Sequence, residues 1–253
     1  PPPPPPPGAP PNGTSRPGDN RWTDSMLALD LDTGNLVWGH QARTHDIFDL
    51  DQVLAARADV EIDGEERSVA VSSGKSGVVY GLDAETGERL WRTEVGIHQN
   101  DDLDEIDGPT EVYPGIQGGV LTPLAIADGT VYVVTINAAT TYEGPETPPG
   151  QSVALGSNDA QVVAIDLATG EIRWDVKLNG DSFGAATVSG DLLVTSTFTG
   201  EIVALDRATG EQVWSYDAPG PHQRLAGGRR RPVDRARRGR QDPPDHGLPP
   251  PRA

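Results

Sequence analysis

The chain has 253 residues, of which 35% are hydrophobic, and it carries a formal net charge of −18 and no cysteine. A chain this acidic is a poor partner for nucleic acid or an anionic membrane surface, because phosphate groups are bound by clustered positive charge. The lack of cysteine excludes disulfides and thiolate metal sites, and no apolar run reaches the length of a membrane span.

The chain starts with a run of prolines, and residues 1–15 are predicted to be a disordered or misread segment. Downstream, the 30 glycines and 24 prolines are interspersed with runs such as "GVVYGLD" and "GTVYVVTIN". Short runs rich in β-branched and aromatic residues, separated by turn formers, favour β-strands. We therefore predict an all-β domain over residues 16–220.

A repeated unit first occurs at residues 28–38 as "ALDLDTGNLVW". It predicts a strand, a tight turn and a second strand ending in tryptophan. Asp30 can accept hydrogen bonds from turn amides, and Gly34 supplies the positive φ that such a turn needs. The unit recurs three times, as "GLDAETGERLW" (81–91), "AIDLATGEIRW" (164–174) and "ALDRATGEQVW" (204–214).

The tryptophans that end these units are separated by 53, 83 and 40 residues. Forty residues is about the length of one four-stranded propeller blade. The long interval is predicted to hold one blade, built on "GGVLTPLAIADGTVYVVTIN", preceded by the acidic insertion "HQNDDLDEIDGP" and interrupted by the loop "TYEGPETPPGQ". The prediction is a β-propeller with about four blades in this chain.

Two acidic segments need separate interpretations. "RTHDIFDLDQ" (43–52) follows the first repeat, and by composition alone it is one more solvated loop. The run "NDDLDEID" lacks the glycine-containing spacing of an EF-hand, so a solvated insertion is the simpler interpretation.

Residues 221–253 are rich in arginine and proline and show no strand pattern. One hypothesis is that this segment is translated out of frame from GC-rich DNA. The alternative is a disordered basic tail.

From Arg16 to Gly77 the sequence resembles the family of pyrroloquinoline quinone (PQQ) dependent alcohol dehydrogenases. The segment "RPGDNRWTDSMLALDLDTGNLVWGHQARTHDIFDLD" is similar to the family's run from a GDN motif, through a DTG turn, to HDxWD, with Phe48 in place of the tryptophan. "VAVSSGKSGVVYGLD" resembles the strand and turn that carry a cofactor-binding Lys or Arg. The resemblance implies an eight-bladed propeller, of which this chain would be the later part.

The resemblance also implies roles for individual residues. Asp49 corresponds to the catalytic base, which removes the hydroxyl proton during hydride transfer from the alcohol to PQQ. Lys75 corresponds to the cation that stabilises charge on the quinone. His45 and Asp46 are expected to brace the loop.

The family binds a metal ion that acts as a Lewis acid. An additional aspartate at Asp51 resembles the lanthanide-using branch, so Asp49 and Asp51 are candidate ligands for Ca²⁺ or a lanthanide ion. If the segment is extended, both carboxylates point to one side and can reach one cation. A solvated position for Asp51 is the alternative.

The resemblance covers residues from about 13 to 220 and lacks the earlier part of the propeller, which in the family supplies the tryptophan that stacks on PQQ and two metal ligands. We therefore expect an inactive fragment of a PQQ- and metal-dependent dehydrogenase. The family implies a small alcohol substrate, a cytochrome or quinone as electron acceptor, and a periplasmic or cell-surface location. The alternative is a non-catalytic propeller that serves as a protein-interaction scaffold, like the outer-membrane assembly lipoproteins.

Overall fold

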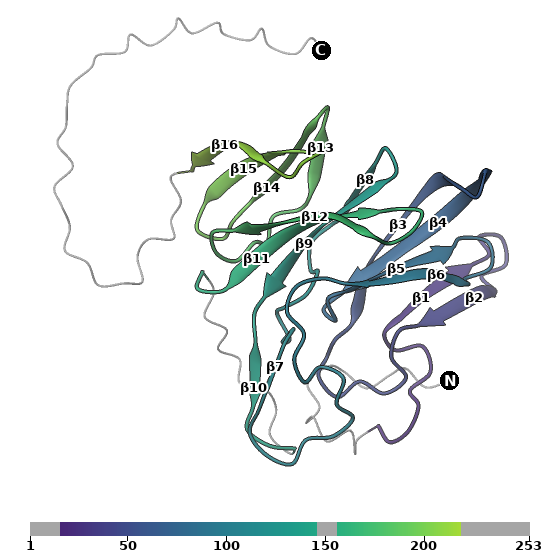
Figure 1. Ribbon diagram of the computed structural model, residues 1–253. Coiled ribbons are helices and arrows are strands. Elements are labelled where there is room, and N and C mark those ends of the chain that lie inside the picture. Colours follow the sequence, from purple (N-terminus) through teal and green to yellow (C-terminus); the bar gives the residue numbers. More distant parts are fainter. Residues whose placement is uncertain (1–15, 146–155, 219–253) are drawn as a thin grey trace, which may run out of the picture. The chain divides into compact units, whose positions relative to one another are not determined.

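The computed structural model describes residues 16–145 and 156–218, all within one unit of the chain that comprises residues 1–222. Within these ranges the ordered elements are sixteen strands and no helix (Figure 1). The prediction of an all-β chain is confirmed for this part. The proline-rich start and the arginine-rich tail lie outside the described residues, so the two hypotheses for each stay as they are. No helix of the described part is long and apolar enough to cross a membrane.

The strands form three four-stranded sheets and two pairs, all with antiparallel neighbours. The first pair is β1 (Ser25–Leu29) with β2 (Leu36–Gln41). The first four-stranded sheet contains β3 (Gln52–Ile62), β4 (Glu65–Gly74), β5 (Val78–Asp83) and β6 (Arg89–Glu94).

The interval from Trp91 to Trp174 leads through one four-stranded sheet, as predicted. That sheet has the order β12-β11-β9-β8 and contains β8 (Ala125–Ala127), β9 (Thr130–Asn137), β11 (Asp159–Asp166) and β12 (Ile172–Leu178). Two short strands of the same interval form a separate pair, β7 (Thr110–Val112) with β10 (Thr140–Tyr142). The last sheet contains β13 (Thr187–Ser189), β14 (Leu192–Ser196), β15 (Glu201–Asp206) and β16 (Gln212–Asp217).

Each repeat forms the predicted hairpin, namely β1-β2, β5-β6, β11-β12 and β15-β16. In the first repeat, the Asp30 carboxylate accepts hydrogen bonds from the amide of Thr33 at 2.8 Å and from its hydroxyl at 2.6 Å. Gly34 has a φ of +70° at the end of that turn. In each of the other three repeats the aspartate also accepts a hydrogen bond from the threonine amide three residues on, and the turn glycines Gly87, Gly170 and Gly210 have positive φ.

The tryptophan of each of the first three repeats contacts the turn of the next repeat. The indole Nε1–H of Trp38 donates to the carbonyl of Ala84 at 3.0 Å, and that of Trp91 donates to the carbonyl of Leu167 at 2.8 Å. Trp174 donates to the carbonyl of Arg207 at 2.9 Å. The turn glycine of the following repeat lies beneath the ring, where a Cβ atom would come within 2.6 to 2.8 Å of the tryptophan. The predicted role of these tryptophans as anchors between neighbouring units is confirmed.

Two apolar clusters fill the space between consecutive sheets. One joins the β3-β6 sheet to the β8-β12 sheet through residues such as Val79, Trp91 and Ile165. The other joins the β8-β12 sheet to the last sheet through residues such as Val162 and Leu205. Burial of these apolar side chains holds the consecutive sheets together.

Candidate active site

The loop between β2 and β3 contains the HDIFD motif, and the carboxylate of Asp46 determines its shape. Asp46 is buried and accepts hydrogen bonds from the amides of Phe48 at 3.0 Å and Leu50 at 2.6 Å. These two bonds span Asp49, whose backbone has a φ of +64°. A non-glycine residue seldom adopts this conformation unless the surrounding structure requires it. Asp46 therefore braces the loop, as predicted.

The GDN segment lies against the same loop. Nδ1 of His45 is 2.9 Å from the carbonyl oxygen of Gly18, and the amide of Asn20 donates to the carbonyl of Thr44 at 2.7 Å. Arg16 donates to the carbonyl of Asp46 at 3.0 Å. The GDN segment is therefore hydrogen-bonded to the backbone of the loop between β2 and β3. His45 has the predicted supporting position.

An apolar cluster lies beneath the loop. Phe48 and Tyr142 are almost fully buried, with their ring centroids 5.1 Å apart, and the Tyr142 hydroxyl donates to the Phe48 carbonyl at 2.9 Å. Ile47, Leu50 and Val112 belong to the same cluster. Tyr142 is on β10, so the small β7-β10 pair anchors the loop from a distant part of the sequence. No motif marked Tyr142 in the sequence.

The three residues singled out from the sequence come together. Nζ of Lys75, which directly follows β4, lies 2.8 Å from Oδ2 of Asp49 and 2.8 Å from Oδ2 of Asp51. The Lys75 amide also donates to the Asp51 carbonyl at 2.9 Å, which connects the loop to the turn after β4. The expected extended segment is not observed, because Asp49 has positive φ. The two carboxylates converge through the bend in the loop rather than through strand alternation.

The pKa values of Asp49 and Lys75 both lie above their ordinary values. Burial raises the pKa of Asp49 above its usual value, and the hydrogen bond and charge of Lys75 offset only part of that effect. Burial also lowers the pKa of Lys75, but the bonds to Asp49 and Asp51 outweigh it and leave that pKa above its ordinary value. The lysine is therefore a cation, held between two acidic side chains.

The arrangement fits a metal ion in part. Both carboxylates reach the same positive centre, so an ion placed there would have two carboxylate ligands. A hard cation such as Ca²⁺ takes six to eight oxygen ligands, more than two carboxylates can supply. Within the described residues no group of three or more His, Cys, Asp or Glu side chains is placed to hold a metal. The remaining ligands would have to come from a cofactor, water or other residues.

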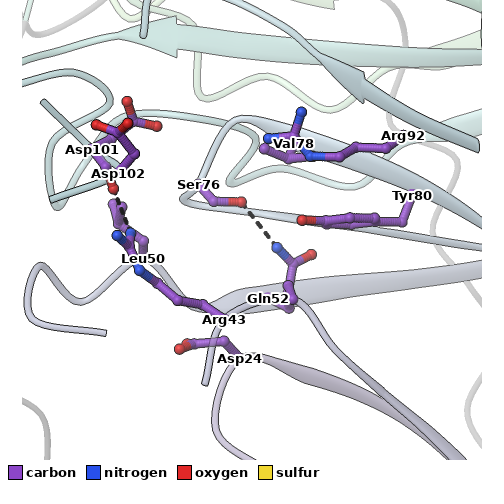
Figure 2. Close-up of a pocket in the computed structure, with 11 residues that line it drawn as sticks. Asp24, Arg43, Leu50, Gln52, Ser76, Val78, Tyr80, Arg92, Asp101 and Asp102 are labelled. Atoms are coloured by element: carbon purple, nitrogen blue, oxygen red, sulfur yellow. Dashed lines mark hydrogen bonds between the residues drawn. The ribbon is translucent and has the colours of Figure 1, made fainter. Parts of the chain in front are cut away.

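A cavity of about 190 Å³ lies beside the loop (Figure 2). Leu50 and Gln52 line this cavity. Asp49, Asp51 and Lys75 do not line it. Arg43 crosses it and donates to the carbonyls of Asp101 and Leu103, so the acidic insertion folds back onto the loop. Figure 2 shows Asp24 beside Arg43 at this cavity.

Asp24 is a buried acid that sequence analysis missed. One of its carboxylate oxygens has no hydrogen-bond partner within the described structure. Burial raises the pKa of Asp24 to about 7, with a further contribution from Asp46 and Asp51. An isolated aspartate in a turn gives no sequence signal, since its burial depends on how the loop folds over it.

Comparison with known proteins identifies the class. A family model described as "Outer membrane protein assembly factor BamB" matches residues 75–240, and one described as "Glucose/ethanol/alcohol dehydrogenase, beta-propeller domain" matches residues 9–123. Both are models of PQQ-type propeller repeats. The chain therefore belongs to the PQQ-repeat β-propeller family.

Among curated proteins, the chain is similar to a dehydrogenase named XoxF from Paracoccus denitrificans, with 28% identity over 82% of this chain and 42% of the relative. It is 27% identical to the lanthanide-dependent methanol dehydrogenase of Methylorubrum extorquens, with the same coverage. The chain thus spans less than half the length of these relatives.

Solved structures confirm the predicted fold. The quinohemoprotein alcohol dehydrogenase from Comamonas testosteroni matches with a TM-score of 0.67 and 20% identity, over 79% of this chain and 36% of that one. A europium-containing methanol dehydrogenase matches with a TM-score of 0.67 and 23% identity, over 79% and 41%. At these identities the likeness shows the fold alone: the sheets are those of a PQQ-type propeller. The total of eight blades stays a prediction.

Proposed function

We propose that this chain contributes the proton-accepting part of the active site in a PQQ- and metal-dependent dehydrogenase that oxidises an alcohol. The observation that carries the proposal is the convergence of Asp49 and Asp51 on Lys75, each at 2.8 Å. The similarity to the dehydrogenase XoxF and to a lanthanide-dependent methanol dehydrogenase over most of this chain supports the same chemistry.

Asp49 is the proposed general base. Its carboxylate accepts the hydroxyl proton of the alcohol as hydride leaves the adjacent carbon for PQQ. A raised pKa makes this carboxylate a stronger base than an ordinary surface aspartate, and the Asp46 bonds on either side fix its position. Proton transfer over hydrogen-bond distance depends on such positioning.

Lys75 is the proposed contact to the cofactor. An ammonium has three N–H donors, and two of them go to Asp49 and Asp51 within the described structure. The third is available for a quinone oxygen, where it would stabilise negative charge.

Asp49 and Asp51 are the proposed ligands for Ca²⁺ or a lanthanide ion. Such an ion, when bound, supplies Lewis-acid polarisation of the quinone. Asp51 adds a second carboxylate, which suits the higher charge of a lanthanide. By the same family argument we propose a small alcohol as substrate, a cytochrome or quinone as electron acceptor, and a periplasmic or cell-surface location.

The experiment is alcohol-dependent dye reduction by the product of the complete open reading frame, supplied with PQQ and either Ca²⁺ or La³⁺. Asp49→Asn is expected to lower kcat by about 10²–10⁴-fold, the usual contribution of a general base. Glu61→Gln, an exposed acid of β3, should leave kcat unchanged. No reduction with either ion, or full activity in Asp49→Asn, contradicts the proposal.

One observation favours a second candidate function. The longer of the two family matches carries the description of an outer-membrane assembly factor, which corresponds to a non-catalytic propeller that binds other proteins. In that case PQQ would neither bind nor support dye reduction, and Lys75→Met would affect only stability. The enzyme is preferred because Asp49, Asp51 and Lys75 are brought together in one group.

A further inference from the structure

The acidic insertion that follows β6 is attached to the loop between β2 and β3. The guanidinium of Arg43, near the start of that loop, donates to the carbonyl of Asp101 and to the carbonyl of Leu103. Figure 2 shows Arg43 reaching across the cavity to Asp101. Leu103 and Ile106 also pack into the apolar cluster beneath the loop. The insertion is therefore held by apolar burial as well as by hydrogen bonds.

His98 attaches the same insertion to the turn after β4, which carries Lys75. A Cβ atom on Gly77 in that turn would lie 3.2 Å from Nε2 of His98, so the imidazole packs directly against the turn backbone. The amide of Val95, three residues before His98, donates to the Gly77 carbonyl at 2.8 Å. The insertion thus contacts both segments of the site, the loop through Arg43 and the turn through His98.

Asp101 determines the orientation of the His98 ring. Its Oδ2 lies 2.8 Å from Nδ1 of His98, and the side chains of His98 and Asp101 are only 17% and 18% exposed. Burial lowers the pKa of His98, but the hydrogen bond and charge of Asp101 outweigh it and leave that pKa above its ordinary value, and the charge of Glu94 adds to the increase. Water screens such a partly buried pair less than a surface pair.

We propose that His98 and Asp101 are positioning residues, which hold the turn with Lys75 against the loop with Asp49. The 2.8 Å separation of Lys75 Nζ and Asp49 Oδ2 depends on both segments keeping their places. The same two segments are joined by the Lys75 amide, which donates to the Asp51 carbonyl at 2.9 Å. The catalytic consequence of this positioning rests on the proposed function, whereas the backbone bond reports the positioning by itself.

Hydrogen exchange at the Lys75 amide tests the positioning without cofactor or metal. NMR of the 253-residue chain gives the protection of this amide in the native state. His98→Phe keeps a planar ring but removes the hydrogen bond and the charge, so it should lower the protection about tenfold. Asp101→Asn keeps an acceptor and removes only the charge, so it should lower the protection by a smaller factor.

Two comparisons separate positioning from other effects. His98→Asn places an amide donor near the position of Nδ1 and should recover part of the protection lost in His98→Phe. Asp104→Asn removes an exposed charge from the same insertion and should leave the Lys75 amide unchanged.

The amides of β11, in the neighbouring sheet, are the internal reference for global stability. Protection that falls at Lys75 and stays constant in β11 shows loss of positioning. An equal fall at both places would show general destabilisation and overturn the proposal. Unchanged protection of Lys75 in His98→Phe, or an equal loss in Asp104→Asn, would overturn it as well.

Dehydrogenase assays of the complete reading frame product, with PQQ and either Ca²⁺ or La³⁺, test the catalytic consequence. His98→Phe should lower kcat about tenfold and leave KM nearly unchanged, because the base and the lysine lose their relative position. His98→Asn should recover part of kcat. An inactive wild type contradicts the proposed function and leaves the amide result standing. An active wild type with the same kcat as His98→Phe overturns the positioning role.

Discussion

Tyr142 donates its hydroxyl hydrogen to the Phe48 carbonyl at 2.9 Å, although 94 residues of sequence separate the two. The bond ends directly next to Asp49, whose positive φ needs support from its neighbours. With Asp46 on the other side, it holds the proposed base between two fixed points.

Tyr142→Phe should destabilise the fold by about 1–3 kcal/mol, because the buried Phe48 carbonyl loses its partner while the ring packing is kept. Urea unfolding measures this loss. Tyr113→Phe is a matched control, since the Tyr113 hydroxyl has no hydrogen bond within the described structure. Equal stability of the two variants would mean that the Tyr142 bond does not support the loop.

Lys75→Met should raise the affinity of the acidic pair for La³⁺ several-fold. The ammonium lies 2.8 Å from both carboxylates and competes with any other cation for them. Isothermal titration calorimetry of the chain with La³⁺ checks this, with Lys177→Met as an exposed control. If the Asp49→Asn, Asp51→Asn double variant still binds La³⁺ as the wild type does, the pair is not a metal site.

Asp24 should make stability depend on pH. Its pKa is about 7 in the folded chain, above the ordinary value of 3.8, so the folded state binds the proton more tightly than the unfolded state. The free energy of unfolding should therefore fall as pH rises from about 4 to 7.

Asp24→Asn should remove this fall and leave the variant more stable than the wild type at pH 8, by up to about 4 kcal/mol at roughly 1.4 kcal/mol per pKa unit. Urea unfolding at pH 5 and pH 8 measures the change. Asp63→Asn, in the exposed turn between β3 and β4, should keep the wild-type pH dependence. A wild-type slope in Asp24→Asn would show that another group is responsible.

Gly34→Ala and Gly87→Ala separate turn strain from tryptophan packing. Both residues have φ near +70°, so both alanines carry the same backbone strain of about 1–2 kcal/mol. Only at position 87 would the new methyl group meet an indole, at 2.6 Å from the Trp38 ring. The Gly87 variant should therefore lose about 1–3 kcal/mol more. Thermal melts of the two variants compare these losses, and equal losses would contradict the packing of Gly87 against Trp38.

The sequence by itself determined the four repeat hairpins, because each hairpin is formed by residues that are only a few positions apart. Asp30 bonds the turn three residues later, and Gly34 takes the conformation that the turn requires. The resemblance to a known family identified Asp49, Asp51 and Lys75 as a group, and the structure brings them within hydrogen-bond distance.

Only the tertiary structure decided the backbone conformation, hydrogen-bond partners and burial of the residues in the site. The bend at Asp49, the Tyr142 bond and the burial of Asp24 all depend on segments distant in sequence that pack together. Local patterns cannot specify such contacts, because burial and hydrogen bonding across tens of residues are properties of the whole packed chain.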